Sequence, residues 1–393
     1  MRIIVHDYPG HMFPLSLSRA LAARGHDVLH LFSASFVSPH GELQRREDDP
    51  ATFNIKGIAL SGGTFDKTNL FKRWEADIEH GRLAVTEIDA FKPDWVLTCS
   101  SPLDAVKLIQ NEVHRQGGKH LFWLQDLIGI AAEKIMRHKV PVVGGLIGKL
   151  YVGFEQRLLA NADAVVMITE DFRPFVPAEQ TNVHVVENWS PIEQIPLRPK
   201  VNAWSTAHGL AETSNWIYTG TLGMKHNPGL LLKLAEENRN DPSFRLVVVS
   251  EGTSVDWLRE NAAAKGLENV VLLPFQAVED FPDVLGSADA LVAILEPSAG
   301  IFSVPSKVLS YLSAGRPILL AVPPENLIAR IVLGHDAGLA VSPLDEDAYL
   351  SAAKQLAADA CRREVMGRNG REYAERTFDI RSITDRFETI LGD

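Results

Sequence analysis

The sequence predicts an α/β protein of two doubly wound domains, each with a parallel sheet covered by helices on both faces. Three observations carry this prediction. The chain has 393 residues, more than one ordinary core holds. Short β-branched runs alternate with helical patterns along it, as in sheets built from crossover units. The alternation breaks once, over residues 190–212, where three prolines interrupt any sustained period, and then resumes.

The first half begins with a strand over 2–6, a helix over 13–25 and a second strand over 27–33. Apolar side chains one turn apart, Leu17 and Leu21, indicate the helix, and Gly25 ends it. Further strands are predicted, with helical patterns beside them, at 94–100, 120–126 and 163–169. The second half repeats this alternation with strands at 215–220, 245–250, 270–274, 290–295 and 317–322.

Composition excludes some classes of protein. The formal net charge is -11, which argues against general nucleic-acid binding because that usually needs a broad basic face. Neither a secretory signal nor a run of the roughly 18–20 apolar residues of a spanning helix is visible, so a cytoplasmic protein is expected. Cys99 and Cys361 lie in apolar contexts and are expected to be buried free thiols.

The turn after strand 215–220 is a candidate ligand site. In doubly wound sheets ligands bind beyond the carboxyl ends of the strands, and between two such domains the cleft is the expected place. Gly220 and Gly223 let the backbone approach a ligand, and a helix from Pro228 would direct its amides there. Lys225 lies in the same loop. The alternative is an ordinary strand-to-helix turn with a solvated lysine.

Two neighbouring strand ends could complete that site. Strand 245–250 is followed by another glycine turn, Glu251–Ser254. Strand 270–274 runs into the apolar stretch Leu273, Pro274 and Phe275, which suits a flat base or plain packing equally.

The segment "VPSKVLSYLSAGRPIL", residues 304–319, places Lys307 in the first turn of a predicted helix that Ser303 or Ser306 can cap after Pro305. A cation there opposes the helix dipole and costs about 0.3–1 kcal/mol when exposed. A bound phosphate would make the place of the lysine favourable instead, because both the lysine and the helix dipole attract an anion. The position therefore favours a phosphate site. An ordinary surface lysine is the alternative.

These segments resemble family 4 glycosyltransferases of the GT-B fold, above all the bacterial branch of surface-polysaccharide enzymes that includes fucosaminyltransferase-like proteins. The likeness rests on "YTGTLGMKHNP", "VVVSEGT", "LLPFQ", "ADALVAIL" and "PSKVLSYLSAGRPIL", which occur in the family's order. "SLSRALAARGHDV" and "ADAVVMIT" agree more loosely, and the tail "MGRNGREYAERTFD" is similar to a helix that crosses back to the first domain.

The resemblance implies that the chain has four parts, and it assigns a role to each of the two domains. The four parts are an acceptor-binding domain at 1–195, a linker at 196–212, a nucleotide-sugar domain at 213–375 and a returning helix at 376–393.

The resemblance also implies transfer of a sugar from a nucleotide-sugar, usually a UDP-sugar, with retention at the anomeric carbon. That donor is a substrate, and no cofactor is expected. The donor residues it implies are Gly220, Thr221, Leu222, Gly223 and Lys225 at the diphosphate, Lys307 with Ser303, Pro305 and Ser306 on its other side, and Glu251, Gly252, Leu273, Pro274 and Phe275 near the nucleoside. Many relatives carry two glutamates around this helix, whose places here are Gly300 and Ser310, so the ribose contact is expected to differ.

The implied reaction needs charge stabilisation at the leaving diphosphate, which Lys225 and Lys307 can supply. No clustered His/Cys ligand pattern is visible in the sequence, and the acidic run "REDDPA" is expected to be a solvated loop, so no metal site is predicted. A front-face path, in which the departing phosphate takes the acceptor proton, is implied by the resemblance alone.

Acceptor-side candidates follow strands of the first domain. Asp126, at the end of strand 120–126, could orient or deprotonate an acceptor hydroxyl, or it could simply cap the next helix. His6, Asp7 and Gly10 follow the first strand, with His11 a weaker candidate.

Residues 127–154 mix apolar and basic side chains, which favours either a membrane-surface patch beside a lipid-linked acceptor or an ordinary helical hairpin. The protein is then cytoplasmic, at the inner face of the membrane. Two other functions stay open: a UDP-sugar 2-epimerase, and a non-catalytic nucleotide-sugar-binding partner subunit.

Overall fold

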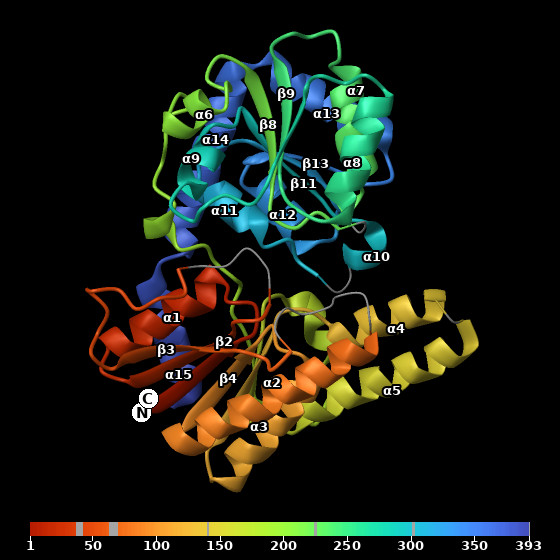
Figure 1. The fold of residues 1–393 in the computed structure, drawn as a ribbon. Coiled ribbons are helices and arrows are strands. Elements are labelled where there is room, and N and C mark those ends of the chain that lie inside the picture. The colour runs from red at the N-terminus through yellow and green to blue at the C-terminus, as the bar shows by residue number, and fades with distance from the viewer. Residues whose placement is uncertain (37–41, 63–69, 140, 224–225, 301–302, 393) are drawn as a thin grey trace. The chain divides into compact units, whose positions relative to one another are not determined.

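A computed structural model describes residues 1–36, 42–62, 70–139, 141–223, 226–300 and 303–392 (Figure 1). The chain forms two compact units. Unit 1 comprises residues Met1–Asn188 and Ile380–Asp393, and unit 2 comprises Trp189–Asp379. Each contains one parallel sheet, so the predicted fold class of two doubly wound α/β domains is confirmed.

Unit 1 has a seven-stranded sheet in the order β3-β2-β1-β4-β5-β6-β7. Its strands are β1 Arg2–Asp7, β2 Asp27–Ser33, β3 Phe53–Ile58, β4 Trp95–Cys99, β5 Lys119–Leu124, β6 Ala164–Met167 and β7 Val183–Val185. Its helices are α1 Met12–Ala23, α2 Leu70–Phe91, α3 Leu103–Arg115, α4 Ile128–Lys139, α5 Pro141–Ala160 and α15 Ile380–Leu391, with a 3₁₀ turn at Glu170–Phe175.

The two faces of this sheet are covered by different helices. One face contributes Ile4, Leu29 and Val96 to a core that includes Ile88 of α2 and Ile109 of α3. On the other face, the Trp123 ring of β5 packs against Phe13 of α1 and Phe387 of α15. Strands buried on both faces read as continuous apolar runs, which is why sequence patterns located most of them.

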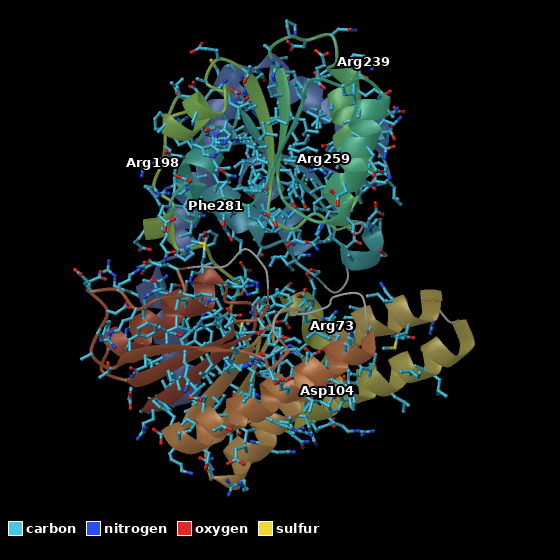
Figure 2. The ribbon with its side chains drawn as sticks, viewed as in Figure 1. Arg73, Asp104, Arg198, Arg239, Arg259 and Phe281 are labelled. Atoms are coloured by element: carbon cyan, nitrogen blue, oxygen red, sulfur yellow. The ribbon has the colours of Figure 1, made fainter. Side chains whose placement is uncertain are left out.

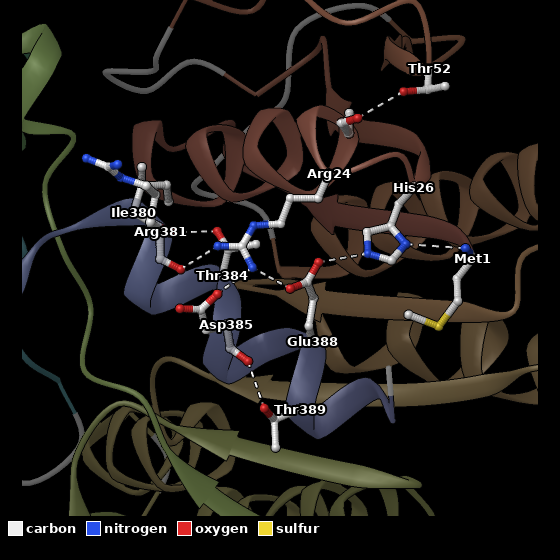
Figure 3. Close-up of polar contacts among 11 residues, drawn as sticks. Met1, Arg24, His26, Thr52, Ile380, Arg381, Thr384, Asp385, Glu388 and Thr389 are labelled. Atoms are coloured by element: carbon white, nitrogen blue, oxygen red, sulfur yellow. Dashed lines mark hydrogen bonds and ion pairs between the residues drawn. The ribbon is translucent and has the colours of Figure 1, made fainter.

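The last helix, α15, belongs to unit 1 although it ends the chain (Figure 3). Arg24 forms ion pairs with Asp385 and Glu388, and Glu388 also contacts the His26 ring at 3.0 Å. The Trp95 indole N–H donates to the Leu391 carbonyl at 3.1 Å. These contacts fix α15 beside α1.

Unit 2 has a six-stranded sheet in the order β10-β9-β8-β11-β12-β13. Its strands are β8 Ser214–Thr219, β9 Phe244–Val249, β10 Val270–Leu273, β11 Ala290–Ile294, β12 Ile318–Ala321 and β13 Gly338–Val341. Its helices are α6 Ala203–Ala207, α7 Pro228–Glu237, α8 Thr253–Ala264, α9 Phe281–Gly286, α10 Pro297–Gly300, α11 Lys307–Ser313, α12 Leu327–Gly334, α13 Glu346–Ala358 and α14 Ala360–Thr377, with a 3₁₀ turn at Ile192–Gln194.

Each sheet has one point where the strand order reverses. In unit 1, β1 lies between β2 and β4, and in unit 2, β8 lies between β9 and β11. The loops that follow two adjacent strands therefore run in opposite directions along the sheet. These adjacent strands are β1 and β4 in unit 1, and β8 and β11 in unit 2. Such switch points are where doubly wound sheets bind ligands.

Two expectations need correction, and a separate finding concerns membrane-spanning helices. Cys361 is exposed rather than buried, because it lies on an outward position of α14. Strand β5 stops at Leu124, so Asp126 lies in the following loop and does not end the strand. Among the described residues, no helix has both the length and the apolar character that crossing a bilayer requires.

Candidate functional site

The switch point of unit 2 brings the predicted glycine loop and Lys307 together. The Gly220 amide donates to the Val249 carbonyl at 3.0 Å, and its φ of +85° lies in the region that favours glycine. Lys307 begins α11, and its Nζ lies 3.3 Å from the Thr221 carbonyl oxygen, to which it donates. A Cβ added to Gly220 would lie 3.8 Å from that same Nζ. The ammonium group therefore borders the backbone turn after β8.

An aromatic ring also contacts this ammonium. The Nζ of Lys307 lies 3.6 Å from the centroid of the Tyr218 ring, a cation–π distance. The Tyr218 hydroxyl in turn donates to the Thr221 carbonyl at 2.8 Å. Both contacts hold the cation against the loop that carries Thr221, an exposed residue, and Leu222, a buried one.

Tyr311, which sequence reasoning missed, fixes the helix that carries Lys307. Its hydroxyl accepts from the Thr219 amide at 3.0 Å and donates to the Val292 carbonyl at 3.3 Å. This fully buried side chain, one helical turn after Lys307, thus ties α11 to the end of β8 and to the middle of β11. Burial raises the pKa of Tyr311 to about 12, so the hydroxyl stays protonated and able to donate. No local sequence signal distinguishes this tyrosine from an apolar core residue.

The segment before α11 is held by Asn326, also missed. Its side-chain amide donates to the carbonyls of Gly300 and Ser303 at 3.1 and 3.0 Å, while its oxygen accepts from the Ile328 amide at the start of α12. Ser306 occupies the cap position of α11 without a side-chain hydrogen bond, so the predicted serine cap is absent there. Pro305 is half-buried next to it, and Ser306 is exposed.

The structure explains why one of the two glutamates found in many relatives is absent here. A Cβ at Gly300 would lie 2.5 Å from Cγ of Pro323, so this position has no room for a side chain. Ser310 is half-buried, and its hydroxyl is 3.3 Å from that of Ser190 in the same unit. Ser310 therefore presents a hydroxyl group but no charge.

Hydrogen bonds also connect the two loops that are predicted to contact the nucleoside. The Phe275 amide donates to the Glu251 carboxylate at 3.2 Å, and the Ser250 amide donates to the Leu273 carbonyl at 3.0 Å. Gly252 has a φ of +105° and directly precedes α8, which begins at Thr253. Pro274 is exposed, whereas the side chains of Leu273 and Phe275 are half-buried. Lys225 lies outside the described residues, so nothing is concluded about its place.

In unit 1 the loop after β1 gathers an aspartate and a histidine. The buried Asp7 carboxylate accepts from the His11 backbone amide and lies 3.1 Å from the His11 ring. Burial alone would lower the pKa of His11, but the Asp7 carboxylate, helped by Asp126, outweighs burial and raises it. Gly10, with a φ of +77°, makes the turn between them.

The side chain of His6, by contrast, lies in the interior of unit 1. Its ring nitrogens lie 2.7 Å from the Ser101 hydroxyl and 2.8 Å from Nε2 of His80, and the ring is fully buried. Burial and the neighbouring His80 lower the pKa of His6, so both rings are neutral near pH 7.

Asp77 on α2 and Asp104 at the start of α3 form a polar cluster beside this pair, and Figure 2 labels Asp104. Tyr8 donates to Asp77 at 3.5 Å, and Tyr151 donates to Asp104 at 3.1 Å. Burial raises the pKa of Asp77 to about 6 despite the charge of Arg73.

Asp126 is exposed in the loop between β5 and α4, and its carbonyl accepts from the Ile128 amide at 3.0 Å. The buried Glu155 on α5 accepts from the Gly129 amide at 3.1 Å, and among the described residues no hydrogen-bond partner is found for its other oxygen, Oε1. Burial raises the pKa of Glu155 to about 7, with a further upward effect from Asp126. Glu155, a third residue missed from sequence, therefore fixes the start of α4 directly after Asp126. Within the described residues, no group of three or more His, Cys, Asp or Glu side chains could hold a metal ion.

Comparisons with known proteins agree with this architecture. Residues 213–359 match the family model described as Glycosyl transferases group 1. No curated protein matches the chain in sequence.

Three solved structures are similar to the whole chain. HepE from Anabaena, in complex with UDP and glucose, has 14% identity and a TM-score of 0.74, covering 100% of this chain and 99% of its own. Sucrose-phosphate synthase from Thermosynechococcus elongatus has 16% identity and a TM-score of 0.76, with 99% and 98% covered. WaaG, a glycosyltransferase involved in lipopolysaccharide biosynthesis, has 17% identity and a TM-score of 0.67, with 100% of both chains covered.

The solved structures and the family model support different conclusions. At such identities the solved structures show the fold, which is GT-B. The matched family model covers most of the unit that carries the glycine loop and Lys307. Through this glycosyl transferases group 1 domain and its GT-B fold, the chain is a glycosyltransferase.

Proposed function

We propose that this glycosyltransferase moves a sugar, with retention, from a UDP-sugar to a saccharide or lipid-linked acceptor in surface-polysaccharide assembly. The single observation that carries the donor assignment is the position of Lys307 against the Gly220–Gly223 loop at the unit 2 switch point. Support also comes from HepE, whose structures contain UDP and UDP-glucose. The finer placement in family 4, on its fucosaminyltransferase-like branch, is part of this proposal.

The diphosphate would lie over the Gly220–Gly223 turn, with Lys307 as its cation and Lys225 as a second one. A fixed ammonium group stabilises negative charge as it develops on the leaving group, without waiting for solvent to reorganise. The nucleoside would lie along Glu251–Gly252 and Leu273–Phe275, which the Phe275–Glu251 hydrogen bond joins. Ser310 replaces a carboxylate contact to the ribose by a weaker hydroxyl contact.

In the proposed step, the acceptor hydroxyl oxygen forms a bond to the anomeric carbon while the bond from that carbon to the diphosphate breaks. The acceptor proton goes to the departing phosphate oxygen, and UDP leaves. Asp126 orients the acceptor hydroxyl, supported by its exposure and its electrostatic effect on His11. Asp7, Gly10 and His11 shape the neighbouring loop, and His6 supports it from inside unit 1.

The acceptor would be a saccharide on a lipid diphosphate, which places the enzyme at the cytoplasmic face of a membrane. The α4–α5 hairpin, within residues 127–160, supports this because it is apolar and basic in an acidic chain. WaaG is a precedent in kind, since it is involved in lipopolysaccharide biosynthesis.

A thermal-shift panel with UDP, UDP-sugars and GDP-sugars tests the donor, because a ligand that binds only the folded state raises its apparent stability. We expect stabilisation by UDP and at least one UDP-sugar, and UDP release when a saccharide acceptor is added. Stabilisation by GDP-sugars alone would overturn the donor assignment. A free epimerised sugar without any acceptor would indicate a 2-epimerase. Donor binding without transfer to any acceptor would indicate a non-catalytic partner subunit, which the missing glutamates at Gly300 and Ser310 would then explain.

A further inference from the structure

We infer that the outward face of α5 docks on an anionic membrane surface. This face consists of Leu146, Ile147, Lys149 and Leu150, and it is called the α5 apolar face below. The inference rests on the proposed function only in naming the membrane as the place of the acceptor, and the docking itself is a separate physical claim.

The α5 apolar face is exposed where a helix on a protein surface is usually polar. Leu146, Ile147 and Leu150 are 64%, 48% and 65% exposed, and their spacing places them on one side of the helix. Ile135, at 54%, lies near the end of α4, the helix that packs against α5. Of the 11 large hydrophobic side chains exposed among the described residues, four lie between 135 and 150. Such clustering marks an interaction surface rather than scattered exposure.

Close packing of the two helices explains why these leucines face outward. A Cβ at Gly144 would lie 2.1 Å from the Met136 carbonyl oxygen, and one at Gly148 would lie 2.5 Å from Cα of Glu133. Glycines four residues apart thus form the inner face of α5 and let the backbones of α4 and α5 nearly touch. The opposite side of α5 is left for Leu146, Ile147 and Leu150. Because the glycine contacts define this orientation, a small rotation of α5 cannot bury the α5 apolar face.

Charge indicates the partner. Residues 128–160 contain five Lys or Arg and two Glu, a net charge of +3, in a chain whose formal net charge is -11. Lys149 lies on the α5 apolar face itself, and Lys134 and Arg137 lie on α4. Anionic headgroups attract such a basic segment while the apolar side chains enter the headgroup boundary. A second copy of the chain would instead bring two equally basic hairpins together, which repel.

The test is flotation of the full-length protein with vesicles of phosphatidylethanolamine and phosphatidylglycerol, compared with pure phosphatidylcholine vesicles. We expect binding to the anionic vesicles that weakens as salt is raised. The double variant Leu146→Gln/Leu150→Gln should bind about tenfold more weakly or worse, because two apolar anchors are lost. The matched control is Leu333→Gln/Leu344→Gln, two leucines of unit 2 that are 51% and 76% exposed. It should bind like the wild type.

Equal vesicle binding by the wild type and the α5 variant would overturn the inference, as would no binding by the wild type. A dimer that dissociates only in the α5 variant, seen by size-exclusion chromatography, would assign the face to a second copy and also overturn it. Circular dichroism melting verifies that the variants fold. Binding of UDP, measured in parallel, separates the two claims. Loss of docking with UDP binding intact concerns the membrane alone, whereas absent UDP binding with intact docking concerns the proposed function alone.

Discussion

Lys307 begins its helix with its ammonium nitrogen 3.6 Å from the centre of the Tyr218 ring, although 88 residues separate the two in sequence. The strand that ends beside Tyr218 and the helix that begins at Lys307 meet because β8 and β11 are neighbours at the switch point of unit 2. The cation is thereby held beside the Gly220 turn before any donor binds.

Tyr311→Phe should destabilise unit 2 by about 1–3 kcal/mol, because it leaves the buried Thr219 amide without the acceptor that Tyr311 provides. Tyr349→Phe is the matched control: its hydroxyl is also buried, and no partner is found for it among the described residues. That substitution should be neutral or slightly stabilising. Urea unfolding of both variants checks the contrast, and equal effects would argue against the bracing role of Tyr311.

Gly300→Ala should destabilise the protein by about 1–3 kcal/mol, because its Cβ would press on the Pro323 ring. Gly334→Ala, at the end of α12 with open space around it, should change the free energy of unfolding by less than about 1 kcal/mol. Restoring the relatives' carboxylate as Gly300→Glu should likewise destabilise and bring no gain in transfer rate. A stable Gly300→Glu variant with raised activity would contradict this steric explanation.

Glu155→Gln should stabilise the protein at high pH and matter little at low pH. Burial raises the folded-state pKa of Glu155 to about 7, so the folded state holds a proton that the unfolded chain has already lost between about pH 4.5 and 7. The contribution of Glu155 to stability therefore falls as pH rises through that window. We expect the variant to gain on the order of 2–3 kcal/mol over wild type at pH 8 relative to pH 4.

Urea unfolding of wild type and Glu155→Gln at several pH values measures that difference. Glu47→Gln, at an exposed position of unit 1, is the control and, as a surface substitution, should change the free energy of unfolding by less than about 0.5 kcal/mol. A flat difference for Glu155→Gln would mean that the carboxyl group is ionised and satisfied in the folded state.

Asp126→Asn should lower the rate of transfer by about 100-fold or more, while UDP binding stays unchanged, if the carboxylate acts on the acceptor hydroxyl. Asp48→Asn, an exposed aspartate of the same unit, should leave both quantities unchanged. Steady-state kinetics with varied acceptor, alongside calorimetry with UDP, separates these effects. Unaltered transfer by Asp126→Asn would remove it from the proposed acceptor site.

The sequence located the buried strands well and the edge strands unevenly, since the edge strand β10 was found within one residue of its bounds. Strand β2 was predicted at its observed bounds because both faces are covered, whereas β3, at the sheet edge, alternates buried and exposed residues and was missed. The glycine turn at Gly220 was also predictable, since φ values above zero favour glycine.

The supporting residues of the site could not be predicted in this way. Tyr311, Asn326 and Glu155 act through partners 92, 26 and 26 residues away, and such pairings leave no local pattern. Asp126 was expected at a strand end because the apolar run "HLFWL" gives no signal that pairing stops at Leu124. Sequence motifs therefore identify groups that could touch a ligand, and the fold reveals those that hold them.

The most direct test of the central claim is the affinity of UDP for wild type and Lys307→Ala, measured by titration calorimetry. Loss of a charge-assisted contact to the diphosphate should weaken binding by about 1.5–3 kcal/mol, roughly 10- to 100-fold, while Lys354→Ala, on α13, should bind like wild type. Uridine, which lacks the diphosphate, should bind both Lys307 forms equally. If Lys307→Ala binds UDP as tightly as wild type, the lysine at the N-terminus of α11 does not hold the donor, and the proposed site is wrong.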